Sequence, residues 1–157
     1  MREVSLDAPA ARPLLDGLEA EYTQRYGEND ELSAYGTSEF APPDGLFLLV
    51  EDGGVVVAGG GLRRLDAEVG EIKRMWTAAP ARRRGHARRV LSALEAAAAD
   101  RGYALLKLET GIEQPEAVAL YRSAGYAQIE KYGRYRDDPR SICMAKGLAP
   151  ARAPQRA

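Results

Sequence analysis

The sequence predicts a mixed α/β fold: one central, mostly antiparallel sheet with a single parallel pair of strands, and helices on both faces. Two observations carry this prediction. Residues 46–77 contain three apolar runs separated by short turns, which is typical of an antiparallel meander. Residues 69–110 then run from strand to helix to strand, a crossover whose two strands should be parallel. The 157 residues suffice for one domain with one core.

The N-terminal part should contribute a short strand and a helix. We expect an edge strand at Val4–Leu6. Apolar residues from 11 to 26 recur at helical spacing, which predicts an amphipathic helix that ends at Gly27. Residues 28–45 carry acids, prolines and glycines, and we expect a loop with room for one short helix.

The meander should consist of strands at 46–51, 55–65 and 69–77. The first is the continuous apolar run LFLLVE, which is typical of a buried strand. The Asp-Gly-Gly sequence at 52–54 is a strong hairpin signal, and residues 66–68 form the second turn. The three strands should therefore pair in chain order.

A helix with an apolar face at 87–98 follows, and Gly102 can end it. Residues 103–110 form the strand that should pair in parallel with 69–77. Pro115 is favourable as the first residue of the next helix, which should end at Gly125.

Two last strands are expected at 126–129 and 141–146, joined by the loop 130–140. The Pro-, Ala- and Arg-rich tail 149–157 should be disordered, so the domain should span residues 1–148. The exposed last strand leaves pairing with a second copy, a homodimer, open.

Composition speaks against several function classes. The net charge is −1 and the pI about 5.9, whereas nucleic-acid or anionic-membrane binders are usually basic. A single histidine, His86, and a single cysteine, Cys143, speak against a His- or Cys-based metal site. No signal peptide and no apolar stretch of membrane-spanning length are present. We expect a cytoplasmic protein that uses no metal, no membrane and no nucleic acid.

A basic segment between the third strand and the next helix carries the functional signal. Gly85 allows a ligand to approach the backbone, and the first helical turn offers unpaired N–H groups. Arginines at 82, 83, 84, 88 and 89 surround this turn. The combination predicts a site for phosphate or pyrophosphate, although a solvated basic helix start is the alternative. Neither a Walker loop nor the GxGxxG pattern is present.

Two motifs resemble one family. Residues 82–87 have the pattern Arg-x-x-Gly-x-Ala, which is similar to the acetyl-CoA signature of the GCN5-related N-acetyltransferases (GNAT). Residues 117–126 have the pattern Ala-x-x-Leu-Tyr-x-x-x-Gly-Tyr, which resembles that family's second motif. They lie on consecutive expected helices with one strand between. The order of elements from Val4 to Lys146 also matches.

This resemblance implies a GNAT-like acyl-CoA N-acyltransferase fold whose parallel pair is splayed at the cofactor site. It implies transfer of an acetyl group from acetyl-CoA to a primary amine of a small or amino-acid-like acceptor, by direct attack and without a metal. A domain of the same fold that binds acyl-CoA without catalysis, as a sensor or interaction module, is the alternative. A nucleic-acid binder that uses the arginines is a third, against which the net charge speaks.

The resemblance also assigns the acetyl-CoA contacts. Main-chain groups at 75–77 should follow the pantetheine arm, and the N–H groups at 83–87 should hold the pyrophosphate. Gln114 stands where many relatives have Asn, and His86, at a variable position, is interpreted as structural. The implied contacts are Met75, Trp76, Thr77, Arg82, Arg83, Arg84, Gly85, His86, Ala87, Arg88 and Gln114, with Arg89 toward the 3'-phosphate.

Two residues are candidates for proton transfer. Glu71 lies 11 residues before Arg82, the offset of the catalytic glutamate in histone acetyltransferases, and is the candidate general base. Lys73, two residues on, would oppose a rise of the Glu71 pKa, and a structural ion pair between them is the alternative. Tyr121 is the candidate general acid or hydrogen-bond donor for the leaving thiolate, with a core tyrosine as the alternative.

The acceptor is not identified by the sequence. The candidate contacts are Tyr22, Tyr26, Lys73, Glu109 and Tyr132. Aromatic rings with acids suit a small amine cation, whereas the arginines of loop 130–140 would equally suit a carboxylate. A solvated loop surface is the alternative.

Overall fold

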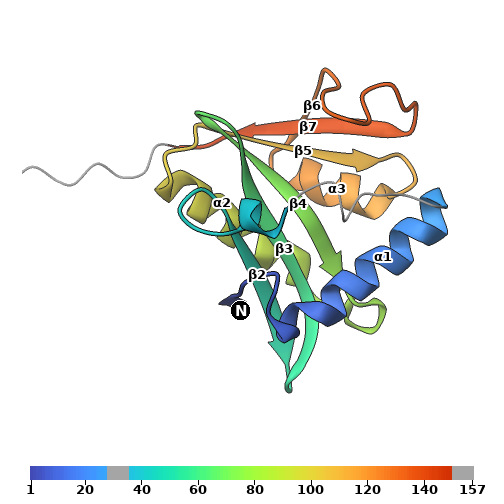
Figure 1. The fold of residues 1–157 in the computed structure, drawn as a ribbon. Helices are drawn as coiled ribbons and strands as arrows, with labels where there is room; N and C mark the ends of the chain where they lie inside the picture. The colour runs from blue at the N-terminus through green and yellow to red at the C-terminus, as the bar shows by residue number, and fades with distance from the viewer. Residues whose placement is uncertain (28–35, 150–157) are drawn as a thin grey trace, which may run out of the picture.

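The computed structural model describes residues 1–27 and 36–149, and in this part of the chain one seven-stranded sheet forms the centre of the fold (Figure 1). The strand order is β1-β2-β3-β4-β5-β7-β6, and the β4–β5 pair is parallel while the other neighbours are antiparallel. The predicted sheet and its single parallel pair are therefore confirmed.

The elements agree with the expected order. The strands are β1 (Arg2–Glu3), β2 (Leu46–Asp52), β3 (Val55–Asp66), β4 (Val69–Thr77), β5 (Leu105–Gly111), β6 (Ala127–Ile129) and β7 (Ser141–Gly147). The helices are α1 (Arg12–Tyr26), α2 (His86–Asp100) and α3 (Pro115–Ser123), with short 3₁₀ turns at Pro9–Ala11, Thr37–Phe40 and Ala79–Ala81.

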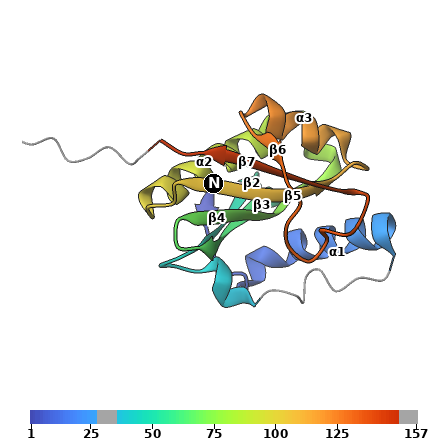
Figure 2. The same cartoon turned by 90° about the horizontal axis from the view of Figure 1, so that it is seen from above.

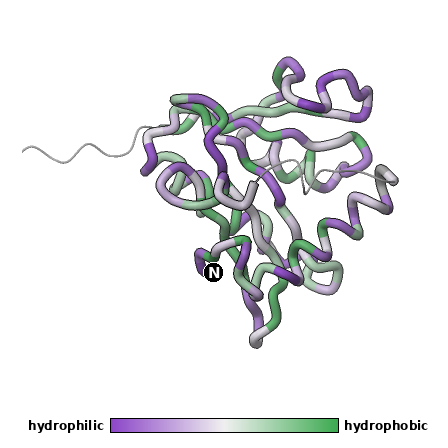
Figure 3. Tube along the Cα trace, in the orientation of Figure 1, coloured by the Kyte–Doolittle hydropathy of each residue, from purple (hydrophilic) through white to green (hydrophobic). Residues whose placement is uncertain are grey.

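Helices cover both faces of the sheet. Figure 2 shows α1 below the sheet and α2 and α3 above it. Leu14 and Leu18 of α1 pack with Phe47 and Leu49 of β2 in one apolar cluster. The larger cluster, on the other face, contains the buried residues of α2 together with Tyr121 of α3. Figure 3 shows how apolar and polar residues alternate along the trace.

The expected N-terminal strand is misplaced by two residues. The edge strand is Arg2–Glu3, and the Val4 N–H still donates to the Phe47 carbonyl of β2 at 2.9 Å. Leu6 is buried in the α1 cluster, so its burial draws the chain away from the edge of β2. The strands expected from 103 and 126 begin at Leu105 and Ala127. The Tyr103 hydroxyl bonds the Asp44 carbonyl at 2.7 Å, and the Tyr126 hydroxyl bonds Glu95 at 2.8 Å.

The parallel pair comes apart inside the sheet. β4 and β5 pair from Val69–Leu105 as far as Ile72–Leu108. Beyond that point β4 stays with β3 up to Thr77, and β5 stays with β7 up to Gly111. Each strand thus keeps a partner on its outer side while a gap opens on the inner side.

An irregularity in β4 accompanies the separation. Between Gly59–Trp76 and Gly61–Lys73 the pairing with β3 slips by one residue. Arg74, inside this slip, has φ of 60°, in the left-handed region that L-residues rarely adopt. Arg74 is only 7% exposed, and its guanidinium lies 4.8 Å from the centre of the Phe40 ring.

The tail from residue 150 on lies outside the described residues. No described helix combines the length and apolarity that crossing a bilayer requires.

Gly45, directly before β2, lies against the main chain at Leu62 and Glu39. A Cβ there would lie 2.3 Å from the carbonyl oxygen of Leu62 and 2.4 Å from that of Glu39. We expect Gly45→Ala to lower the free energy of unfolding by about 1–3 kcal/mol, because two main-chain segments must move. Gly147→Ala is the control, since a Cβ there meets nothing within 4 Å. Equal denaturation midpoints for the two variants would contradict this prediction.

Candidate active site

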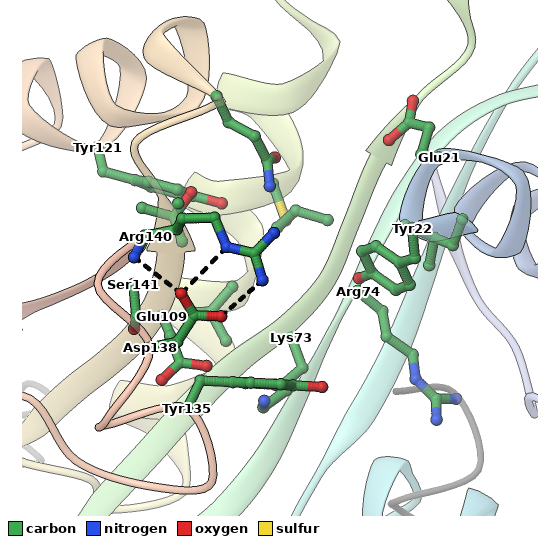
Figure 4. Close-up of a pocket in the computed structure, with 16 residues that line it drawn as sticks. Glu21, Tyr22, Lys73, Arg74, Glu109, Tyr121, Tyr135, Asp138, Arg140 and Ser141 are labelled. Carbon is green, nitrogen blue, oxygen red and sulfur yellow. Dashed lines mark hydrogen bonds and ion pairs between the residues drawn. The ribbon is translucent and has the colours of Figure 1, made fainter. Parts of the chain in front are cut away.

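A cavity of about 320 Å³ lies where β4 and β5 separate. Its walls come from five segments: α1, β4, β5, the start of α3 and the loop before β7 (Figure 4). Those residues are Leu18, Glu21, Tyr22, Ile72, Lys73, Arg74, Met75, Glu109, Thr110, Gly111, Gln114, Tyr121, Tyr135, Asp138, Arg140 and Ser141.

Charged groups of both signs line the cavity from opposite sides. β4 contributes Lys73 and Arg74, and β5 contributes Glu109. Arg140 closes the wall that we call the acceptor wall (Tyr135, Asp138, Arg140 and Ser141). Figure 4 shows the Arg140 guanidinium extending into the cavity.

Asp138 holds the Arg140 guanidinium through two hydrogen bonds and the Arg140 main chain through a third. Nε of Arg140 donates to Oδ1 of Asp138 at 3.1 Å, and Nη2 donates to Oδ2 at 2.8 Å. The Arg140 main-chain N–H also donates to Oδ1, at 2.8 Å. These hydrogen bonds lower the pKa of the Asp138 carboxyl to about 2, so the pair is ionised at neutral pH.

Tyr121 reaches the cavity from α3 and is 6% exposed. Burial raises the pKa of its hydroxyl, so the phenol stays protonated at neutral pH. Its ring packs edge-on against Tyr126, with centroids 5.8 Å apart. The side chain is thus a fixed hydrogen-bond donor on the cavity wall.

Glu71 is 3% exposed and is not one of the residues that line the cavity. Its Oε1 accepts a hydrogen bond from Arg63 at 2.6 Å, and its Oε2 accepts one from the Tyr132 hydroxyl at 2.6 Å. The ion-pair interpretation gains support, but the partner in these contacts is Arg63 of β3 rather than Lys73. Arg63 also pairs with Glu39 at 2.9 Å.

Tyr132 belongs to this buried network and is likewise not among the cavity-lining residues. Burial and then the charge of Glu71 raise the pKa of its hydroxyl, which therefore remains a donor. Lys107 lies 5.1 Å from the centre of its ring. The network thus joins the loop after β6 to strands β3, β4 and β5.

The segment before α2 has the geometry of an anion site, which we call the cradle (residues 83–88). Arg83 and Gly85 both have positive φ, 65° and 81°. A Cβ on Gly85 would meet nothing within 4 Å, so the backbone is open to a ligand there. The first N–H groups of α2, from His86 on, have no acceptors within the helix. A diphosphate fits this arrangement.

Two predicted phosphate ligands have protein partners. Arg82 donates from Nη2 to Glu21 at 2.6 Å and from Nε to the Thr77 carbonyl at 3.4 Å. Arg88 donates to the hydroxyl of Ser123. Because Glu21 lines the cavity, the Arg82 contact joins the cradle to the cavity wall.

The remaining predicted contacts divide between cavity and core. Those that line the cavity are Tyr22, Lys73, Met75, Glu109, Gln114 and Tyr121. Trp76 and Thr77 are not among the lining residues, and the Trp76 indole packs against Gly17 of α1. Both ring nitrogens of His86 are buried without a hydrogen-bond partner among the described residues. The Tyr26 side chain lies outside the described part.

Sequence reasoning missed Arg74 and Arg140. Arg74 lies inside an apparently regular strand, and nothing in its neighbours signals its positive φ. It lines the cavity, while its guanidinium lies over the Phe40 ring. Arg140 directly precedes β7, and an arginine that ends a loop is ordinary on a surface. The part of the chain that the structure describes contains no cluster of three or more His, Cys, Asp or Glu side chains able to hold a metal ion.

Comparison with known proteins decides the family. The model of the Acetyltransferase (GNAT) family matches residues 12–126. The chain belongs to the GNAT family of acetyltransferases. The splayed pair, the cradle and the cavity described above are thus features of a GNAT protein.

Individual relatives agree with this assignment. An IAA acetyltransferase of Azospirillum brasilense is 40% identical over 110 residues, 69% of this chain and 71% of the relative. An uncharacterized N-acetyltransferase of Bacillus subtilis, YsnE, is 36% identical over 76% of this chain and 80% of its own. The crystal structure of a GNAT acetyltransferase from Elizabethkingia anophelis with acetyl-CoA bound has a TM-score of 0.71 and 18% identity, covering 94% and 96% of the two chains.

The Asp138–Arg140 pair predicts a measurable titration. The carboxyl pKa is about 2 in the folded protein and about 3.9 in unfolded chains. Because the folded value is the lower one, the pair stabilises the protein above about pH 4. That contribution is lost as pH falls toward 2. Carbon-detected NMR should show the low value, and Arg140→Gln should return it toward 3.9. Titration of wild-type Asp138 near 3.9 would refute the pairing.

Proposed function

We propose that this GNAT protein transfers an acetyl group from acetyl-CoA to the primary amine of a small acceptor by direct attack. The observation that carries the proposal is the cavity at the β4–β5 separation, which the Arg82–Glu21 contact joins to the open cradle at the start of α2. Relatives named as acetyltransferases and a similar fold with acetyl-CoA bound support it.

The residues of the cradle fit the diphosphate of acetyl-CoA. The N–H groups of the first turn of α2 would hold it, with the helix dipole in the favourable direction. Main-chain groups of β4 at 75–77, beyond the last pair with β5, would run beside the pantetheine amides. When bound, acetyl-CoA supplies the acyl thioester at the cavity between the strands.

Tyr121 is suited to protonate, or to bond, the leaving sulfur. Its hydroxyl is buried at the cavity wall and keeps its proton at neutral pH, because burial raises its pKa. A thiol has a lower pKa than such a phenol, so full proton transfer is uphill and a hydrogen bond to the developing thiolate suffices. Tyr121 thus stabilises charge on the leaving group.

Glu109 is the better candidate than Glu71 to receive the proton of the amine. Glu109 lines the cavity just past the last β4–β5 pair, with Cys143 Sγ 3.7 Å from its Oε2. Glu71 is not among the lining residues, and both of its oxygens accept hydrogen bonds from buried partners. In the transfer an ammonium acceptor would first give one proton to Glu109. The N–C bond then forms as the C–S bond breaks, and the second proton of the nitrogen passes to the leaving thiolate, to which Tyr121 is hydrogen-bonded.

Two Glu→Gln variants distinguish these roles. We expect Glu109→Gln to lower kcat by about 10²–10⁴, the usual contribution of a general base, with little change in melting temperature. Glu71→Gln, the matched control, should mainly lower stability, by about 1–3 kcal/mol, because Arg63 loses its charged partner. The assay follows free CoA thiol with a panel of amines.

If Glu71→Gln lowers kcat by that amount and Glu109→Gln does not, Glu71 is the general base. Stabilisation of the wild type by acetyl-CoA with no thiol release from any amine would instead favour a non-catalytic acyl-CoA-binding domain.

The two ends of α2 offer a matched test of the cradle. Gly85 and Gly102 have φ of 81° and 84°, and a Cβ on either meets nothing within 4 Å. Alanine at each should cost a similar ~1–2 kcal/mol of stability. Only Gly85→Ala should also weaken acetyl-CoA binding in calorimetry, by roughly tenfold, which corresponds to one charge-assisted hydrogen bond. Equal affinity in the two variants would show that the diphosphate binds elsewhere.

A further inference from the structure

The charged groups that line the cavity balance in number. Among the described residues that line it, Lys73, Arg74 and Arg140 are cations, and Glu21, Glu109 and Asp138 are anions. The lining therefore presents groups of both signs and no net charge.

This balance bears on the acceptor. A simple primary amine has a pKa near 10 and arrives from water as a cation, which adds a net positive charge to the cavity. An acceptor that also carries a carboxylate arrives as a zwitterion, adds no net charge and can meet lining groups of both signs. Electrostatic complementarity therefore favours the second kind of molecule.

The acceptor wall offers groups for that carboxylate. Asp138 engages Nε and Nη2 of Arg140 and thereby fixes the plane of a guanidinium that has five N–H donors in all. Ser141, next in the chain, is 7% exposed and lines the same cavity. The Ser141 hydroxyl lies near the Cys143 thiol, whose pKa burial raises and the Ser141 hydroxyl lowers. Among the described residues, however, the buried Ser141 Oγ has no partner in full hydrogen-bond geometry.

Glu109 stands across the cavity opening from β4. Glu109 follows the last β4–β5 pair by one residue on β5, and Lys73 does so on β4. The Glu109 carboxylate and the Lys73 ammonium group therefore flank the opening of the gap. Tyr121, the donor proposed for the leaving sulfur, lines the same cavity. An ammonium at Glu109 thus lies in the cavity where the acyl transfer is proposed, and a carboxylate of the same molecule can turn to the acceptor wall.

We propose that the acceptor is a small amino acid-type zwitterion, whose carboxylate binds Arg140 and Ser141 while its amine meets Glu109. The proposal rests on the proposed acetyltransferase function and specifies its acceptor. The carboxylate is unchanged in the reaction and serves only to bind and orient. Arg140 is accordingly the residue that determines specificity.

Matched acceptors test this directly. Phenylalanine, phenylalaninamide and 2-phenylethylamine differ in the carboxylate, and leucine, leucinamide and 3-methylbutylamine form an aliphatic set. With acetyl-CoA saturating, we expect kcat/KM for the better of the two amino acids to exceed that for its decarboxylated amine by about 10²-fold or more, because a site built for a polar group rejects the analogue that lacks it.

Arg140→Gln should reduce this preference to within about threefold, mainly by raising KM for the amino acid. A circular dichroism spectrum and a cooperative melting transition like those of the wild type would show that the variant is folded. Arg136→Gln is the control: the residue lies in the same loop, is exposed and is not among the cavity-lining residues, so it should keep the wild-type preference.

Each remaining outcome is decisive. Equal or faster acetylation of the decarboxylated amines by the wild type overturns the zwitterion proposal and leaves the acetyltransferase function standing. Unchanged preference in Arg140→Gln overturns the assignment of the carboxylate to the acceptor wall. Absence of thiol release with all six acceptors, although acetyl-CoA binds, overturns both this inference and the proposed function.

Discussion

The site depends on the point at which two parallel strands stop pairing. β4 and β5 exchange hydrogen bonds only as far as Ile72 and Leu108, and each then continues with its outer neighbour. The inner edges of the two strands beyond that point no longer pair with each other. The gap creates the cavity, and in the proposed function it is where an extended pantetheine arm would run between the strands.

A buried ionic network supports the wall opposite β4. Arg63 and Tyr132 bond the two oxygens of Glu71, and Tyr132 belongs to the same loop as Asp138 and Arg140. Removing one partner of such a network leaves a buried charge or donor unsatisfied, which is costly. Glu71, at the offset that is catalytic in histone acetyltransferases, thus bonds the loop here, and of these two strand glutamates only Glu109 is among the residues that line the cavity.

Several site residues were predictable because their signal is local. Met75 and Tyr121 followed from the two motifs, and Lys73 and Glu109 from their place on the central strands, and all four line the cavity. Arg74 and Arg140 were not predictable. Arg74 lies where the pairing of β4 with β3 shifts by one residue, and its φ is positive there. Arg140 lines the cavity with its guanidinium held by Asp138. Neither feature is visible in the neighbouring residues.

The sequence by itself determined the order of helices and strands, the parallel crossover and the anion-binding turn at Gly85. Each depends on apolar periodicity, on turn residues or on the unpaired N–H groups of a helix start, all of which act over a few residues. Tertiary structure alone decided where β4 and β5 separate, which of Glu71 and Glu109 faces the cavity, and which arginines enter it. These outcomes depend on contacts between residues distant in sequence, such as Arg63 with Glu71 and Tyr132 with Glu71, whose geometry no local pattern encodes.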